Sequence, residues 1–281
     1  MTALQAILPQ HWLSRLIGKL AQLEQPLWLK NVLIRTFMRR YGIDLTDASC
    51  RAGADFPHFN AFFTRSLRDG ARPLSEALWC HPADGVLSQR GNIVGAELVQ
   101  AKGRSYSVEA LLAGGGAEAD RFANGCFATT YLSPRDYHRV HMPVRGRLLR
   151  TRYVPGDLFS VNAATVDRVQ GLLARNERLV CFFETDRGGV ALVLVGAMIV
   201  AGVATVWGGR EVPGTGAIRE QTWPADEAPV LEVGQEMGRF FLGSTVVLVT
   251  ESSDLDWVDQ AGDAVRVRAA LAHAAAESSP T

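Results

Sequence analysis

Residues 240–249 read FFLGSTVVLV, and the rest of the fold is expected to form around this stretch. Most of its residues are apolar or β-branched, and the run is short, so it predicts a buried β-strand. Gly243 and Ser244 interrupt the apolar pattern, and the Ser244 hydroxyl is within reach of the Gly243 carbonyl. Two interpretations are open. Either a glycine relieves crowding in a bulge or turn, with the serine bonded to backbone, or the chain cuts itself here.

The composition is that of a globular protein with no global charge signal. The 281 residues are 47% hydrophobic and 21% charged, with zero formal net charge, so nothing in the balance indicates nucleic acid as a partner. The four cysteines form no CxxC motif, which favours free thiols over a disulfide framework or a zinc site. One large domain, or a domain with an appended segment, is expected.

An uncharged run at 190–207 is just long enough for a membrane span. It is rich in Val and contains Gly196 and Gly202, and Gly-Gly pairs flank it at 188–189 and 208–209. These features favour two buried strands over a transmembrane helix.

The first 70 residues have a helical pattern and a basic bias. Pro9 can open a helix with an apolar stripe from Trp12 to Leu23, and Pro26 can open a second one that ends in Arg39 and Arg40. A third short helix is predicted around residues 59–63. Residues 1–40 carry six Lys or Arg against one Glu. The helices can pack on the protein's own core or lie in an anionic membrane surface, and the two interpretations are compatible.

From about residue 79 the pattern changes to short apolar or alternating runs broken by Gly, Pro and Asn. This predicts an α+β fold with a mainly β, sandwich- or barrel-like core and N-terminal amphipathic helices. A short helix is expected at 108–112. The Ala-rich tail after Trp257 is expected to be weakly helical, with residues 277–281 frayed.

Three residues outside residues 240–249 could take part in chemistry. His138 and His141 form an HxxH pair in a proline-flanked loop or strand edge, but no HExxH and no third ligand accompany them, so no metal is expected. Packed or solvated histidines and a general acid or base are the remaining interpretations. Asp84 precedes a glycine, as turn residues do, yet its carboxylate could also orient an imidazole. Asp, His and Ser in this order also match a subtilisin-type hydrolase, although no GxSxG is present.

Several blocks, in order, resemble the bacterial phosphatidylserine decarboxylase proenzymes, over roughly residues 55–250. The tetrapeptide LGST at 242–245 resembles their processing site. The other matching blocks are FFTRSL at 62–67, PADG at 82–85, QAKG at 100–103, YLSPRDYHRVHMP at 131–143, YVPGDLFSVN at 153–162, ARNER at 174–178 and GQEMGRF at 234–240.

The resemblance implies a self-cleavage that consumes the serine. The Ser244 hydroxyl attacks the Gly243 carbonyl and the amide becomes an ester. β-Elimination then separates a β chain, residues 1–243, from an α chain, residues 244–281. Hydrolysis of the resulting dehydroalanine with loss of ammonia leaves a pyruvoyl group at position 244 in place of any separate cofactor. That group would serve as the electron sink for decarboxylation of phosphatidylserine to phosphatidylethanolamine.

The resemblance also implies roles and partners. Asp84, His141 and Ser244 would form the cleavage triad, and His138 would handle protons during decarboxylation. Residues 1–70 would be a docking segment that binds an anionic membrane through residues 1–40, and residues 71–281 the catalytic domain. A dimer of αβ units on the cytoplasmic face of a bacterial inner membrane is expected. The alternatives are a Ser-His-Asp hydrolase with Ser244 intact and a non-catalytic lipid-surface protein.

Overall fold

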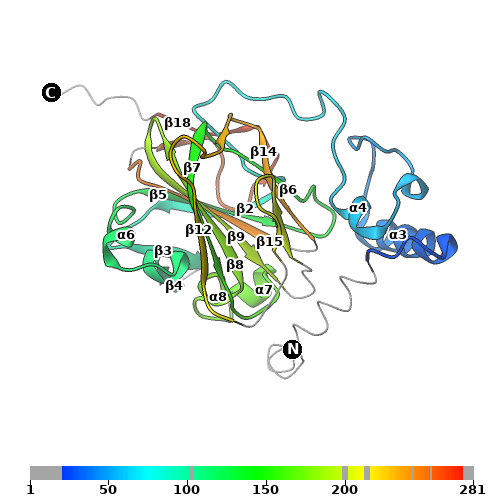
Figure 1. Ribbon diagram of the computed structural model, residues 1–281, viewed down its shortest axis with the longest axis horizontal. Coiled ribbons are helices and arrows are strands. Elements are labelled where there is room, and N and C mark those ends of the chain that lie inside the picture. Colours follow the sequence, from blue (N-terminus) through cyan, green and yellow to red (C-terminus); the bar gives the residue numbers. More distant parts are fainter. Residues whose placement is uncertain are drawn as a thin grey trace.

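The computed structural model describes residues 21–101, 104–197, 202–211, 216–241, 244–253 and 255–274 (Figure 1). The helices are α3 (Leu27–Tyr41), the 3-10 turn η1 (Gly53–Asp55), α4 (Phe59–Phe63), α5 (Val108–Leu112), α6 (Gly116–Asp120), α7 (Ala163–Val166) and α8 (Leu172–Arg175). The predicted helix between Pro9 and Leu23 lies almost entirely outside the described residues.

Antiparallel strands make up most of the fold. They are β1 (Trp79–Cys80), β2 (Gly85–Asn92), β3 (Glu97–Ala101), β4 (Arg104–Ser107), β5 (Cys126–Leu132), β6 (Arg139–His141), β7 (Gly146–Val154), β8 (Arg178–Thr185), β9 (Gly188–Gly196), β10 (Val203–Thr205), β11 (Gly209–Glu211), β12 (Arg219–Thr222), β13 (Val230–Leu231), β14 (Glu236–Phe240), β15 (Ser244–Thr250), β16 (Leu255–Trp257), β17 (Ala264–Val265) and β18 (Ala270–Ala274).

The largest sheet has the order β12-β7-β8-β9-β15-β5-β2-β17, with β13 added beside β7. Smaller sheets have the orders β11-β10-β14-β6 and β1-β18-β16, and β3 pairs with β4. Among the described residues the largest sheet ends at β12 and β17 without closing, so the predicted α+β fold is confirmed but the core is not a closed barrel.

Side chains alternate along β15 between two cores, one on each face of the largest sheet. Val246 and Leu248 pack in one core with β6, β10, β14 and β18, whereas Val247 and Val249 pack in the other with α5, α8 and the β3–β4 pair. This alternation is the period-2 pattern of a strand buried on both faces. The strand predicted from residues 240–249 is therefore confirmed from Ser244 onward.

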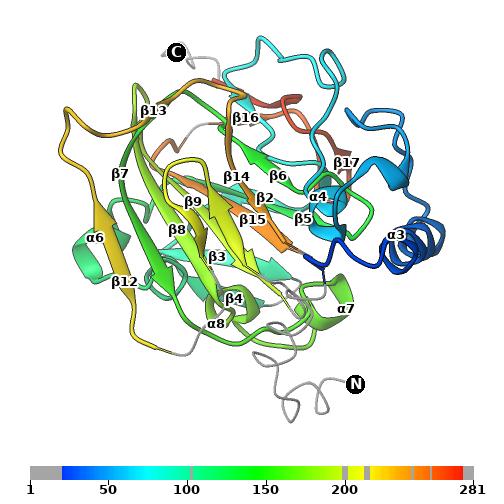
Figure 2. The same cartoon turned by 45° about the vertical axis from the view of Figure 1, so that its right-hand side comes forward.

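The N-terminal region, residues 21–70, has a small core of its own. Pro26 precedes α3, and Gly42 ends it in the left-handed conformation with φ +63°. The buried Lys30 Nζ donates to the carbonyls of Ala54 and Phe56 at 3.0 and 2.6 Å. This core consists of Ala21, Ile34, Ile43, Leu45, Ala48, Phe56, Phe59, Phe62 and Phe63. Figures 1 and 2 show α3 and α4 on one side of the strands.

Several local predictions can be compared directly with these elements. The helices after Pro26, at 59–63 and at 108–112 are confirmed. The run at 190–207 contributes to β9 and β10, and no helix in the described ranges is long and apolar enough to cross a bilayer. The weakly helical tail is wrong. Residues Ala270–Ala274 form β18, since pairing with β1 and β16 outweighs the helix propensity of alanine.

Candidate active site

Ser244 lies at the start of the strand in the middle of the largest sheet. Its backbone pairs with Leu132 on β5 and with Gly196 on β9, and the residue is completely buried. Its Oγ has no hydrogen-bond partner within the described ranges. A buried hydroxyl without a partner costs about 1–3 kcal/mol and is rare in native proteins, so this atom calls for a functional explanation. Leu242 and Gly243 lie outside the described residues.

His138 is completely buried beside the strand that leads into Ser244. Its Nδ1 lies 2.8 Å from the carbonyl oxygen of Asp136 and therefore carries the proton, which leaves a lone pair on Nε2. Nε2 has no partner in the described part of the chain. The Phe63 ring packs on the imidazole with ring centroids 4.1 Å apart. Burial lowers the pKa of His138 to about 3, so the ring is neutral and its free nitrogen is a proton acceptor.

The ring of His141 is held at both nitrogens. Nδ1 donates to the Gly234 carbonyl at 2.8 Å, and Nε2 accepts the Tyr137 hydroxyl at 3.0 Å. Burial is the main cause that lowers the pKa of His141, and burial also raises the pKa of Tyr137, which therefore keeps its proton. In this arrangement the imidazole is neutral and its single lone pair is occupied.

Asp84 is bound to an arginine. The Arg72 Nε and Nη2 atoms donate to its two carboxylate oxygens at 3.2 and 2.7 Å, and the Val267 N–H donates at 2.8 Å. The same arginine bonds Asp47 at 2.6 Å. The Asp84 loop nevertheless lies beside His141, because the His141 N–H donates to the Pro82 carbonyl at 2.8 Å.

The predicted residues converge on one region without forming a closed hydrogen-bonded triad. Among the described residues no hydrogen bond joins Asp84 to His141, or either histidine to Ser244. His141 lies opposite Glu236 at the start of β14, while the His138 carbonyl accepts the Phe240 N–H at 3.0 Å at its end. His138 therefore lies at the end of β14 that leads to Ser244.

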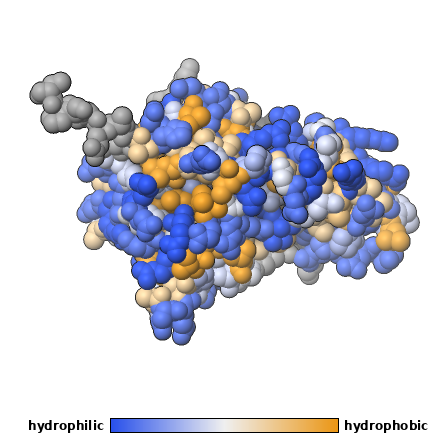
Figure 3. All heavy atoms as spheres, turned by 90° about the horizontal axis from the view of Figure 1, so that it is seen from above, coloured by the Kyte–Doolittle hydropathy of each residue, from blue (hydrophilic) through white to orange (hydrophobic). Residues whose placement is uncertain are grey.

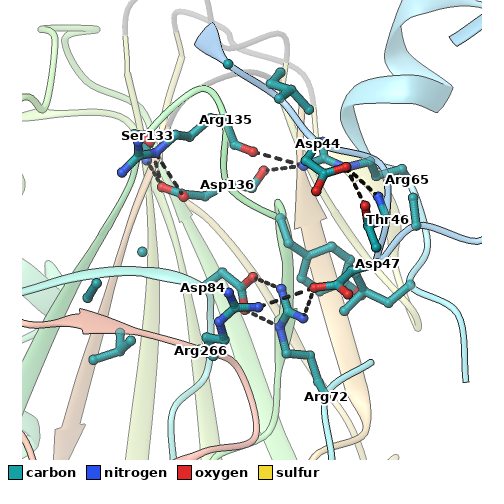
Figure 4. Close-up of a pocket in the computed structure, with 18 of the residues that line it drawn as sticks. Asp44, Thr46, Asp47, Arg65, Arg72, Asp84, Ser133, Arg135, Asp136 and Arg266 are labelled. Carbon is teal, nitrogen blue, oxygen red and sulfur yellow. Dashed lines mark hydrogen bonds and ion pairs between the residues drawn. The ribbon is translucent and has the colours of Figure 1, made fainter. Parts of the chain in front are cut away.

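A cavity of about 490 Å³ borders these loops (Figure 4). Its walls come from the N-terminal region, from the Asp84–Val86 turn, from residues 133–137 and from residues 264–266. Positive and negative side chains alternate on it: Asp44, Asp47, Asp84 and Asp136 face the cavity together with Arg65, Arg72, Arg135 and Arg266. The walls therefore present balanced charge.

The sequence pattern did not single out Tyr137, Arg65 or Arg72. Tyr137 and Arg65 lie within blocks that carry the resemblance, next to a predicted histidine and after the FFT tripeptide, but neither has a motif of its own. Arg72 lies outside these blocks, and only the folded chain brings it to Asp84.

Comparison with known proteins identifies the family. The profile described as Phosphatidylserine decarboxylase matches residues 59–273, and a second one described as PSD matches residues 1–42. A phosphatidylserine decarboxylase proenzyme of Alcanivorax borkumensis is 51% identical over 95% of this chain and 94% of its own. Proteins of the same description from Pseudomonas aeruginosa and Polaromonas naphthalenivorans are 51% and 49% identical. They cover 94% and 98% of this chain, and 92% and 96% of their own lengths. The chain therefore belongs to the phosphatidylserine decarboxylase family.

Proposed function

We propose that this chain is a proenzyme that cuts itself between Gly243 and Ser244 and then decarboxylates phosphatidylserine to phosphatidylethanolamine. The observation that carries the proposal is the Ser244 hydroxyl, which is buried and unpartnered within the described ranges at the first position of β15. The hydroxyl of a buried serine is usually bonded to backbone or to another polar group.

Position 244 suits a pyruvoyl group. The side chain is enclosed, and the buried residues from Thr245 to Thr250 that follow it hold the strand in the sheet. The proton-accepting Nε2 of His138 is likewise buried and unpartnered among the described residues. A pyruvoyl group supplies an electron sink for the pair of electrons left by departing CO₂.

For the cleavage step, we assign Ser244 as nucleophile, His141 as base and Asp84 as the group that orients and stabilises the protonated base. The Ser244 hydroxyl adds to the Gly243 carbonyl and loses its proton, and the amide nitrogen leaves with a proton. Because Tyr137 bonds the lone pair of His141, this transfer requires Tyr137 to release that bond. Arg72 bonds Asp84 in the uncut chain, so the orienting role also requires the carboxylate to leave Arg72, and the Asp84 loop already contacts His141 through the Pro82 carbonyl.

For turnover, we assign proton handling to His138. A neutral ring with a free Nε2 must accept a proton before it can deliver one, so His138 is suited first to the role of base and then to that of acid. Its burial between α4 and the end of β14 keeps water from competing for that atom.

For substrate access, we assign residues 1–70 to docking on an anionic membrane surface, with residues 1–40 in contact with lipid, and residues 71–281 to catalysis. Within the described part, α3 exposes Trp28 by 67% together with Leu27, Leu29, Val32 and Leu33, and carries Arg35, Arg39 and Arg40. Figure 3 shows apolar and polar side chains side by side at this end of the molecule. Such a surface suits the headgroup region of a bilayer.

The proposal includes a peripheral position on the cytoplasmic face of a bacterial inner membrane and a dimer of αβ units. Both rest on the resemblance to the bacterial proenzymes.

The test uses the purified chain and its Ser244→Ala variant with phosphatidylserine vesicles. We expect the unaltered chain to release CO₂ and form phosphatidylethanolamine, and the variant to do neither. An uncut chain that hydrolyses esters would instead indicate a serine hydrolase, and an uncut, inert chain that binds vesicles would indicate a lipid-surface protein.

A further inference from the structure

Arg65 is a buried arginine without a carboxylate partner. Only 6% of the residue is exposed, and it forms no ion pair with any described Asp or Glu. Buried arginines are normally paired, because an unpaired charge away from water is costly. That burial lowers the pKa of Arg65. Asp84 and Asp136 attract this charge from beyond ion-pair distance, which opposes the effect of burial.

The guanidinium binds backbone carbonyls, as that of the buried Arg178 does, whereas that of Arg72 binds carboxylates. Its Nη2 donates to the carbonyl oxygens of Arg135 and Asp136, at 2.9 and 3.2 Å (Figure 4). Its flat face lies over the Phe62 ring, 5.7 Å from the ring centre. Its Nη1 has no partner among the described residues. Arg65 therefore fixes the backbone of residues 135–136 from the N-terminal region.

The same backbone carries His138. The Asp136 carbonyl that accepts Arg65 Nη2 also accepts His138 Nδ1, at 2.8 Å. Two further contacts join the segments: the Phe63 ring packs on the imidazole, and the Arg139 Nε donates to the Thr64 carbonyl at 2.9 Å. Residues 62–65 thus hold residues 135–139 along their length.

We propose that Arg65 is a positioning residue for His138: by holding the Asp136 carbonyl it fixes the imidazole with its proton on Nδ1 and leaves Nε2 as the proton-accepting atom. The inference rests on the proposed role of His138 in decarboxylation. It gives the N-terminal region a part in the chemistry in addition to docking.

The charge of Arg65, like its hydrogen bonds, favours the neutral form of His138. A cation beside the imidazole disfavours the imidazolium and so helps to lower the pKa of His138, after burial itself. The Asp136 carboxylate is turned away and accepts the N–H and hydroxyl of Ser133, both at 2.7 Å. From α4 and β14, the residues next to His138 are Phe63 and Phe240, which are uncharged.

The first test measures the protonation of the His138 imidazole in a protein that does not turn over substrate. In an uncut Ser244→Ala background with isotope-labelled histidine, NMR follows the His138 ring from about pH 8 to about pH 5. The His138 signal is assigned by its loss in His138→Gln. We expect the ring-nitrogen shifts of a single neutral tautomer with its proton on Nδ1 when Arg65 is present, and a mixture of the two tautomers in Arg65→Gln. Arg65→Lys keeps the charge but not the planar fork, so the His138 ring of that variant should also show a mixture of tautomers.

The second test uses the cleaved enzyme. Arg65→Gln and Arg65→Lys are expected to lower kcat by at least ~10-fold, with a smaller change in KM, because a misplaced proton carrier slows the chemical step. Arg68→Gln is the matched control, since Arg68 is an exposed arginine of the same segment that bonds the Thr46 carbonyl. Thermal unfolding and the extent of self-cleavage show whether each variant is folded.

The results separate this inference from the proposed function. An unaltered chain that neither cuts itself nor decarboxylates would overturn the proposed function. An active unaltered enzyme whose Arg65 and Arg68 variants behave alike would overturn the positioning role. So would a rise in KM at unchanged kcat, or a His138 signal that does not respond to Arg65→Gln.

Discussion

Ser244 Oγ and His138 Nε2 belong to a group of eleven buried side-chain atoms without a hydrogen-bond partner among the described residues. Each unmet bond costs about 1–3 kcal/mol, and these two atoms lie at the start of β15 and beside the end of β14, where the proposed chemistry takes place. His141 differs, because both of its nitrogens are engaged. This contrast is the basis for testing the two proposed histidine roles separately.

Substitution of each histidine is expected to produce a different defect. His141→Gln should leave the chain uncut, since the cleavage step loses its base. His138→Gln should still be cut but should lose decarboxylation by roughly 10²–10⁴-fold, the usual contribution of a positioned proton carrier. Denaturing electrophoresis measures self-cleavage, and a CO₂-release assay measures decarboxylation. The control is His273→Gln, because His273 is exposed. If His141→Gln cuts normally while His138→Gln does not cut, the two assignments are reversed.

Acidification is expected to destabilise the folded chain through its buried histidines. Burial lowers the pKa of His81, His138 and His141, that of His138 to about 3, so the unfolded chain binds protons more readily than the folded one. Stability is then complete above about pH 6.5 and falls below it, by about 1.4 kcal/mol per pH unit for each histidine until its folded pKa is reached. Urea unfolding of the uncut Ser244→Ala chain between about pH 7 and about pH 5 measures this slope.

The slope should decrease when His138→Gln is added, because one group no longer takes up a proton on unfolding. Equal slopes in the two chains, or stability independent of pH across this range, would contradict neutral buried histidines.

The sequence alone predicts which residues lie in the same region. It predicts less well which hydrogen bonds and ion pairs those residues form. Asp84 pairs with Arg72, 12 residues away, and Tyr137 bonds His141, 4 residues away. Both pairs are brought together by loops, which have no regular period in the sequence. The unpaired charge of Arg65 likewise becomes visible only when burial is known.

A strand or helix could be predicted from the sequence where its local residue pattern and its tertiary packing favour the same structure. The apolar, β-branched residues 244–250 form a strand, and the residues after Pro26 form α3, because propensity and burial favour the same structure. The Ala-rich residues 270–274 form a strand against their helix propensity, since β1 and β16 provide open edges for pairing. Contacts between distant segments of this kind leave no local signal.

The turn that carries Asp84 is expected to tolerate no side chain at Gly85. This residue has φ +153°, and a Cβ there would fall on the Tyr131 carbonyl oxygen. Gly85→Ala should therefore displace β2 from β5, lower the unfolding free energy by about 1–3 kcal/mol and slow self-cleavage. Gly91→Ala on the same strand is the matched control, because its φ is +150° but the nearest atom, in Phe127, is 3.9 Å away. Equal losses in the two variants would show that backbone conformation, and not this contact, is responsible.

The exposed face of α3 is expected to bind lipid. Val32→Glu removes an apolar contact and adds a negative charge, so it should weaken binding to anionic vesicles roughly tenfold or more. Sedimentation of the protein with vesicles of phosphatidylglycerol and phosphatidylcholine measures the change. Val94→Glu provides the control, because Val94 is an exposed valine outside the N-terminal region. Equal binding by both variants and the unaltered chain would argue against docking through α3.

Across the entire chain, the fold explains how a cut protein can stay assembled. The segment after Ser244 contributes β15 to the middle of the largest sheet, where it pairs with β5 and β9 along its full length. The same segment adds β17 to β2 and β18 to β1, and the His81 Nε2 lies 2.8 Å from the Asp259 carboxylate. These contacts hold the α chain without the peptide bond at position 243, so the new N-terminus can remain buried and become the reacting group.

The intact masses of the denatured, unaltered protein, before and after borohydride, test self-cleavage. We predict a chain of residues 1–243 and a chain of residues 244–281. The smaller chain should be lighter by one ammonia than the same peptide beginning with serine, and should gain two hydrogen atoms with borohydride. Ser244→Ala should give the uncut mass of 30.5 kDa, less one oxygen. A full-length unaltered chain, a small chain that begins with unmodified serine, or cleavage of the Ser244→Ala chain at this bond would contradict the account.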